Sequence, residues 1–208
     1  ADPRLRTLVT LGSPFKAEAH RDWLRDIDIV CVRNVAYDPK QADALRRMGK
    51  TVWLYASGPT PPYPTPVIDF PGLAARIIPW MCWKLRAPGF LYWSVNFWTK
   101  DPYRDPMNTP WGQHGNGLLF YPGPDGPVPS IRLALLRDGV DDYDYLSLLA
   151  DEVARVSGAP NPSQDVRDRL AEARAALAID KRLVASAGTY TQDPERLLAE
   201  GARLAELI

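Results

Sequence analysis

The sequence predicts an α/β fold in which repeated βα units form a parallel sheet. Four short apolar runs recur at regular spacing along the first half of the chain; each is followed by a loop, and three are followed by a helical pattern. This alternation is typical of parallel sheets with right-handed crossovers. The 208 residues are 46 % apolar with 25 basic and 25 acidic side chains, the composition of a globular chain that buries a full core.

The first two predicted strands are residues 5–11, "LRTLVTL", and residues 27–34, "IDIVCVRN". Both are short apolar runs, as buried parallel strands usually are. A helix is predicted between them at residues 18–25. After the second strand, Asp38 is expected to cap a helix that has Pro39 at its first position and ends at the glycine of "MGK".

The third strand, residues 51–57, and the fourth, residues 89–96, flank a helical pattern at residues 70–87. Residues 100–129 form a segment rich in proline and glycine that is too long for a simple connection. We therefore expect this segment to be functional or to act as a lid. Ser130 is predicted to cap the helix that follows it.

The C-terminal third of the chain is predicted to be helical. The first of its helices is expected to break at Gly139, because glycine lowers helix propensity. Two further amphipathic helices are expected at residues 163–178 and 193–208, each with Ser or Asp at its start. These two helices are predicted to be packing elements.

Charge and hydropathy argue against two classes of partner. A chain with balanced charge and no basic run has no electrostatic footprint for nucleic acid or for an anionic membrane surface. The longest apolar runs are far below the roughly 20 residues that a membrane-spanning helix needs. A neutral ligand is therefore the default expectation.

Cys31 and Cys82 have neither CxxC nor zinc-ligand spacing, so we expect two buried free thiols. Two free thiols do not indicate the compartment in which the protein works. The acidic run in "RDGVDDYDY" does not follow the calcium-loop pattern and is predicted to be a solvated or capping face rather than a metal site. No metal or cofactor is predicted.

Ligand sites in parallel α/β sheets lie beyond the carboxyl ends of the strands. The fourth strand ends in "YWSVNFW", which surrounds one amide with flat aromatic side chains. Carbohydrate sites combine aromatic platforms with directional amides and hydroxyls, because sugars present flat C–H faces and hydroxyl groups. The candidate substrate-binding residues are therefore Tyr55, Trp93, Asn96 and Trp98. For the aromatic residues, core packing stays open as the alternative.

Arg33 ends the second strand, and two roles stay open for it: a site residue, or one half of an ion pair at the rim. Glycoside hydrolysis usually needs two carboxyl groups that flank the scissile bond, and no such pair follows the strands. Asp101 and Asp105, four residues apart in "KDPYRDP", stay open as acids of a self-contained hydrolase. His20 and His114 pair with no obvious Ser or Cys nucleophile. No catalytic residue is assigned.

Three stretches carry a resemblance to a known family. They are "GFLYWSVNFW", "GNGLLFYPGPDGPVPSIRLALLRDGVDDYDYLSLL" and "VASAGTYTQDPERL". Together they resemble the C-terminal part of the DUF4091 family, a catalytic domain similar to that of glycoside hydrolase family 123. The resemblance implies that residues 1–150 form the C-terminal half of a (β/α)8 TIM barrel, with four parallel strands and their helices. Residues 151–208 would be a helical extension that packs on it.

The resemblance also implies an activity, that of a retaining β-N-acetylgalactosaminidase or related hexosaminidase with a substrate-assisted mechanism. Its Asp-Glu acid pair would follow the fourth barrel strand, upstream of this chain, because the first strand here corresponds to the fifth. The Asp-Glu dipeptide that the chain does contain, Asp151-Glu152, belongs to a C-terminal helix. Asn116 stands where family members tend to carry an acid. Arg132 and Arg137 are expected to tie the last barrel helix to the preceding loop by ion pairs.

The chain alone is therefore expected to be inactive and to need a partner. That partner would be the missing N-terminal half-barrel, or a second copy of the chain, since four parallel strands with two open edges invite pairing. The alternative to a glycosidase is a non-catalytic protein that binds carbohydrate or acts as a scaffold.

Overall fold

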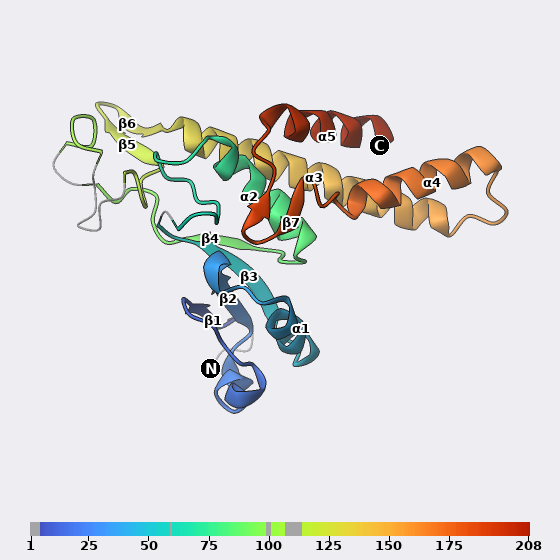
Figure 1. The fold of residues 1–208 in the computed structure, drawn as a ribbon, viewed down its shortest axis with the longest axis horizontal. Coiled ribbons are helices and arrows are strands. Elements are labelled where there is room, and N and C mark those ends of the chain that lie inside the picture. Colours follow the sequence, from blue (N-terminus) through green and yellow to red (C-terminus); the bar gives the residue numbers. More distant parts are fainter. Residues whose placement is uncertain (1–4, 59, 99–100, 107–113) are drawn as a thin grey trace.

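The computed structural model describes residues 5–58, 60–98, 101–106 and 114–208, and Figure 1 shows their arrangement. Within these residues the protein is an α/β structure with a four-stranded parallel sheet and five α-helices. The sheet and helix α1 (Pro39–Arg47) form one part of the molecule, and the long helices lie across its other end (Figure 1). None of the described helices has the length and apolarity required to cross a lipid bilayer.

The sheet contains four strands in the order in which they occur along the chain. They are β1 (Leu8–Leu11), β2 (Ile29–Arg33), β3 (Thr51–Ala56) and β4 (Phe90–Tyr92). Every adjacent pair is parallel, as predicted. The strands are shorter than the sequence predicts. β4 ends early because the chain beyond it pairs elsewhere: Asn96 forms an antiparallel bridge with Leu118.

The two faces of the sheet are covered unequally. Val30 and Val52 point to the side that carries α1 and are buried in the core. On the opposite face, Trp53 and Tyr55 are only half-buried. The indole of Trp53 covers Gly89, where a Cβ atom would come within 2.2 Å of the ring. Glycine at the start of β4 therefore allows the ring and the backbone to approach closely.

Two short 3-10 helices, η1 (Glu18–His20) and η2 (Trp23–Asp26), replace the single helix predicted at residues 18–25. Neither has a side-chain cap, which is the signal that normally fixes a helix start. Helix α1 matches its prediction: the Asp38 carboxylate accepts from the backbone N–H two residues on, at 2.8 Å. The helix ends before Gly49, whose φ of 76° is in the left-handed region.

The prediction of a helix break at Gly139 is wrong. Helix α3 (Ile131–Ser157) is continuous, and it also runs through residue 150, the boundary predicted between the two parts of the chain. It packs along α2 (Leu73–Lys84), and a Cβ atom at Gly139 would lie 2.4 Å from the carbonyl oxygen of Arg76. The glycine is therefore explained by the close approach of two helices and not by an interruption of one.

A buried carboxylate joins the same two helices. Asp142 on α3 accepts two hydrogen bonds from the guanidinium of Arg76, each 2.9 Å long, and a third from the indole N–H of Trp80 at 2.8 Å. Both partners lie on α2. The acidic run thus contributes a structural clamp, and the described residues contain no group of three side chains able to hold a metal ion.

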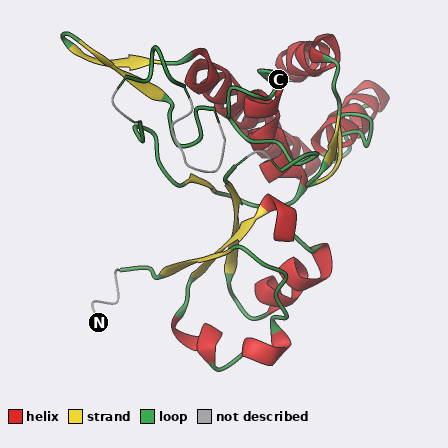
Figure 2. Cartoon of the chain, turned by 60° about the vertical axis from the view of Figure 1, so that its left-hand side comes forward, coloured by secondary structure: helices red, strands yellow, loops and turns green. Residues whose placement is uncertain are grey.

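The C-terminal helices form where the sequence predicts them, as α4 (Gln164–Leu177) and α5 (Pro194–Leu207). Figure 2 shows them beside α3, and the three helices share the larger hydrophobic core with α2. Two hairpins were not predicted. They are β5 (Phe120–Gly123) with β6 (Gly126–Pro129), inside the expected long loop, and β7 (Val184–Ser186) with β8 (Thr189–Tyr190).

Both cysteines are free and buried, as predicted. Burial raises the pKa of the Cys31 thiol and of the Cys82 thiol to about 12. Both thiols therefore stay protonated at neutral pH and act as small apolar side chains.

Candidate functional site

A cleft of about 370 Å³ opens at the carboxyl ends of β2, β3 and β4, the edge at which the sequence predicts a site. Its lining includes Arg33, Tyr55, Ser57, Gly58, Trp93 and Asn116. Residues from four separate segments thus meet there. Two of the predicted substrate-binding residues, Tyr55 and Trp93, are among them.

Trp93 follows β4 and presents its indole to this cleft. The indole N–H donates to Asn116 Oδ1 at 2.9 Å. The ring covers Gly117, where a Cβ atom would come within 2.4 Å of the indole, and it contacts Phe97 with 4.9 Å between ring centroids. The aromatic plane is therefore fixed by a hydrogen bond at one edge and by packing at its face.

The side-chain oxygen of Asn116 accepts hydrogen bonds from three residues in or beside the cleft, a role that the sequence analysis did not predict. Its Oδ1 accepts from Trp93 Nε1, from the backbone N–H of Gly58 at 3.3 Å and from the Tyr92 hydroxyl at 3.3 Å. The side chain is almost fully buried, at 2 % exposure. The flanking glycines were a usable signal, since Gly117 (φ 76°) adopts a conformation that L side chains rarely take.

Tyr92 extends the same network. Its oxygen accepts from the Gly117 N–H at 2.8 Å while its O–H donates to Asn116. Burial raises the pKa of the Tyr92 phenol to about 12, although the hydrogen bond from Gly117 opposes this shift. The phenol therefore keeps its proton at neutral pH and remains a donor.

Arg33 lies at the end of β2, paired in register with Tyr55 on the neighbouring strand. Its Nη2 donates to the carbonyl oxygen of Ser57 at 3.0 Å. Its Nε is buried and has no hydrogen-bond partner among the described residues. The ion pair that the sequence left open as an alternative does not form within the described part of the chain.

Asn96 and Trp98 lie outside the residues that line the cleft. Asn96 is exposed, and the segment around it pairs through its backbone with the turn that carries Asn116: Phe97 N–H donates to the Gly117 carbonyl at 2.9 Å. Trp98 is half-buried. A sugar contact from either side chain stays a prediction, while the backbone of this segment fixes the position of the turn.

Arg132, on the first turn of α3, holds the loops on both sides of the site. Its Nη1 donates to the carbonyl oxygens of Pro66 and Gly115, each at 2.8 Å, and the side chain is buried. Within the described residues it therefore ties helix to loop as expected, but through carbonyl groups and not through ion pairs. Arg137 is exposed and pairs with its neighbour Asp138 at 2.8 Å.

The carboxylates near the site have other partners. Asp101 Oδ1 accepts from the backbone N–H groups of Tyr103 at 3.1 Å and Arg104 at 3.3 Å, which is the geometry of a turn cap. Asp69 accepts from His114 Nδ1 at 2.5 Å and from its backbone N–H at 3.0 Å. Burial acts to raise the Asp69 pKa, but the His114 hydrogen bonds outweigh it and lower the pKa.

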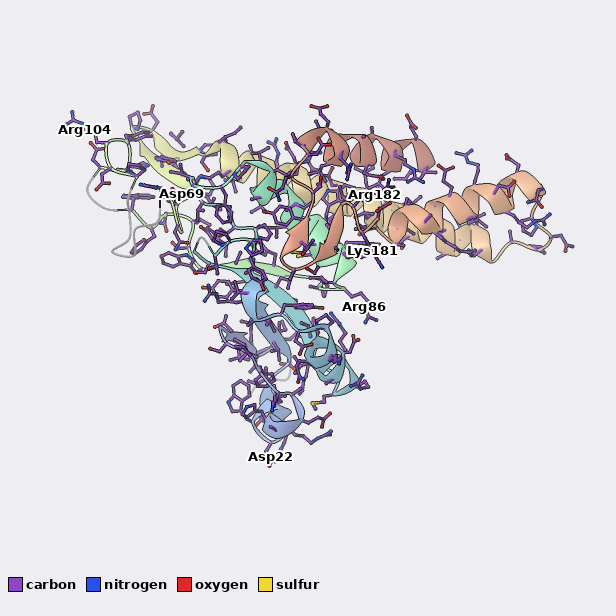
Figure 3. All side chains as sticks on the ribbon, in the orientation of Figure 1. Asp22, Asp69, Arg86, Arg104, Lys181 and Arg182 are labelled. Atoms are coloured by element: carbon purple, nitrogen blue, oxygen red, sulfur yellow. The ribbon has the colours of Figure 1, made fainter. Side chains whose placement is uncertain are left out.

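Figure 3 labels two aspartates, Asp69 and Asp22, at different ends of the sheet. Asp69 lies among the loops beyond β4, on the same side as Arg104, whereas Asp22 lies at the opposite end of the sheet. No carboxylate from the described residues lines the cleft itself. The arrangement can hold a ligand between an aromatic face and polar groups, but the described lining residues include no carboxylic acid for acid catalysis.

Comparison with known proteins identifies the family. The family model of the glycoside hydrolase 123 catalytic domain matches residues 9–149, more than half of the chain, and this segment contains the cleft and all of the sheet except Leu8. A search of curated proteins finds no match. Glycosidase function is the activity that this domain indicates. The chain belongs to the glycoside hydrolase 123 catalytic-domain family.

Proposed function

We propose that the chain is part of a retaining glycosidase that hydrolyses terminal β-linked N-acetylhexosaminides, as an N-acetyl-β-galactosaminidase does. The observation that carries the proposal is the cleft at the carboxyl edge of the sheet, in which the fixed indole of Trp93 faces polar groups. An apolar sugar face stacks on such a platform while hydroxyl and amide groups bond the polar wall. The family match supports the reaction class.

The proposed mechanism divides the chemistry between two parts of the protein. The 2-acetamido oxygen attacks the anomeric carbon, a Glu protonates the leaving oxygen, and the preceding Asp orients the amide. This acid pair is supplied from upstream of the chain. Within the chain, Trp93 forms the wall, the Tyr55 hydroxyl contacts the acetamido group, and Asn96 and Trp98 contact a substrate that extends beyond the cleft.

We also propose that the four strands are half of a (β/α)8 barrel, completed by an N-terminal half or by self-association. Two features support this. β1 and β4 each have one strand neighbour among the described residues, and the face that carries Trp53 and Tyr55 is half-buried and not closed. Sedimentation of the isolated chain tests the idea, since a stable, well-folded monomer would contradict it.

Turnover of a chromogenic N-acetyl-β-galactosaminide tests the activity. The 208-residue chain alone is expected to show none, and the chain joined to the segment that precedes it in its gene is expected to be active. Turnover by the chain alone would contradict the division of the chemistry. Absence of turnover in the longer protein would contradict the glycosidase proposal.

A non-catalytic carbohydrate-binding role is the second candidate, and the absence of a carboxylate among the described residues of the cleft favours it. Binding of N-acetylgalactosamine or a thiazoline analogue without turnover in the longer protein would support this role. A self-contained hydrolase that uses Asp101 is disfavoured because this carboxylate caps a turn. If Asp101→Asn or Asp105→Asn abolished activity of the chain alone, that third reading would be restored.

A further inference from the structure

The cleft carries one cation and no anion among its described lining residues. Arg33 provides the cation, and Tyr55, Ser57, Trp93 and Asn116 are uncharged at neutral pH. A guanidinium remains protonated at every physiological pH. The chain has no net charge, but that value is a sum over all residues, whereas the charge among the described lining residues of the cleft is positive.

The environment of Arg33 differs from that of the other arginines in the interior. Arg76 is neutralised by the carboxylate of Asp142, and Arg132 donates to two backbone carbonyls and approaches a tyrosine hydroxyl. Arg33 has one acceptor, the carbonyl oxygen of Ser57, although a guanidinium has five N–H groups. Its hydrogen-bonding capacity is therefore largely unused within the described residues.

The backbone around Arg33 holds the side chain in place. A Cβ atom at Gly12, at the end of β1, would lie 3.6 Å from Arg33 Cδ, so the aliphatic part of the side chain packs at the end of the neighbouring strand. The hydrogen bond to Ser57 anchors the head group to the end of β3. An arginine anchored at both ends loses little further freedom when it binds a ligand.

We propose that Arg33 makes the cleft a site for an acidic sugar, one that carries a sulfate ester or a carboxylate. The guanidinium binds the anionic group, and the sugar ring lies against the indole of Trp93. Charge-assisted hydrogen bonds from a guanidinium to a sulfate or carboxylate are about twice as strong as neutral hydrogen bonds. The planar guanidinium can also donate two parallel hydrogen bonds to two oxygen atoms of such an anion. This inference rests on the proposed function and narrows its substrate class to sugars with a negative charge.

Isothermal titration of the 208-residue chain tests the inference with three probes: N-acetylgalactosamine, N-acetylgalactosamine 6-sulfate and galacturonic acid. We expect the 6-sulfate or the uronic acid to bind about tenfold tighter than the neutral sugar at low ionic strength. The charged sugar that binds more tightly than N-acetylgalactosamine shows whether the site prefers a sulfate ester or a carboxylate. The advantage should shrink as salt is added, because salt screens the interaction.

Three variants assign the effect to the residue. Arg33→Gln should remove the preference for the charged sugar, and Arg33→Lys, which keeps the charge and a donor for Ser57, should retain part of it. Arg104→Gln is the matched control: Arg104 is exposed, points away from the sheet and pairs with Asp101 (Figure 3). It should keep the full preference.

The outcomes separate this inference from the function on which it rests. Equal binding of neutral and charged sugars, or a preference that survives in Arg33→Gln, overturns the role of Arg33 and leaves the sugar site intact. Failure of all three probes to bind overturns the sugar site of this chain and the role of Arg33 with it, whereas the glycosidase proposal is tested separately, by turnover in the longer protein. If the glutamine variant does not fold, Arg33→Lys and the salt titration carry the test: a preference that is partly retained in the lysine variant and shrinks as salt is added supports direct charge pairing, and an unchanged preference at high salt refutes it.

Discussion

Replacing Asn116 with alanine removes the oxygen that three donors of the cleft share. The indole N–H of Trp93, the backbone N–H of Gly58 and the hydroxyl of Tyr92 would each lose an acceptor in a region where Asn116 itself is 2 % exposed. A buried donor left unsatisfied costs about 1 to 3 kcal/mol. Two of the three bonds are long, at 3.3 Å, so the lower value applies to them.

With about 1 kcal/mol for each long bond and about 1 to 3 kcal/mol for the bond to Trp93, Asn116→Ala should lower the free energy of unfolding by about 3 to 5 kcal/mol. Urea denaturation measures it: with a slope of about 2 kcal/mol per molar, the midpoint should fall by about 1.5 to 2.5 M. Near-UV circular dichroism should also change, because the Trp93 ring loses its anchor. Asn116→Asp keeps an oxygen acceptor and should lose less.

The matched control is Asn96→Ala, which removes the same amide from an exposed position on the neighbouring segment. Surface substitutions of this kind usually change stability by less than about 0.5 kcal/mol. If Asn116→Ala cost no more than Asn96→Ala, the three hydrogen bonds would not support the cleft and the reasoning would fail.

Three other predictions concern packing and pH. Gly139→Ala should destabilise the protein by about 1 to 3 kcal/mol in urea denaturation, because the new methyl group meets the carbonyl of Arg76 at 2.4 Å. Asp142→Ala should cost about 3 kcal/mol, since it leaves that guanidinium without its carboxylate. The folded-state pKa of Asp69 is lowered below 3.8, so its contribution is complete above that pH and lost as the pH falls through the folded pKa. The stability difference between the unchanged chain and Asp69→Asn, from urea midpoints in a pH series, should therefore narrow in acid.

Helix α3 and its C-cap residue supply controls for the Gly139 and Asp142 variants. Gly158→Ala, where a Cβ atom meets its nearest neighbour at 3.7 Å, should leave stability nearly unchanged. Asp141→Ala, an exposed carboxylate next to the clamp, should do the same. Equal losses in test and control would refute the assigned contacts, and a difference for Asp69→Asn that widens in acid would contradict the sign of its pKa shift.

Local signals predicted most of the fold. Asp38 and Gly49 mark the two ends of α1, and Ser163 and Asp193 cap α4 and α5, because capping depends on the few residues at each helix end. Gly139 shows the limit of such reasoning. The same glycine that weakens an isolated helix is required where a second backbone approaches within contact distance, and that approach is a tertiary fact.

The site was predicted in part for a similar reason. Strand ends could be located from the sequence, so Tyr55 and Trp93 were expected at the carboxyl edge, where both line the cleft. The glycines that flank Asn116 were a signal of special backbone geometry, but its hydrogen-bonding role could not be predicted, because its partners Gly58 and Tyr92 come from segments that meet only in the folded chain. For Arg33 the sequence left two roles open, a site residue or one half of an ion pair. Which role applies depends on the carboxylates that the fold brings near its guanidinium.

Arg132 and Asp142 lie on one continuous helix, and this makes the cleft depend on residues that do not line it. The arginine fixes the loops at Pro66 and Gly115, and the aspartate fixes the helix against α2. A protein cut after residue 149 would retain every residue that lines the cleft, yet it would end inside α3 and lose the α4 and α5 surfaces that cover it. We therefore expect a cleft that keeps its shape to need α4 and α5, which lie outside the segment that matches the family model.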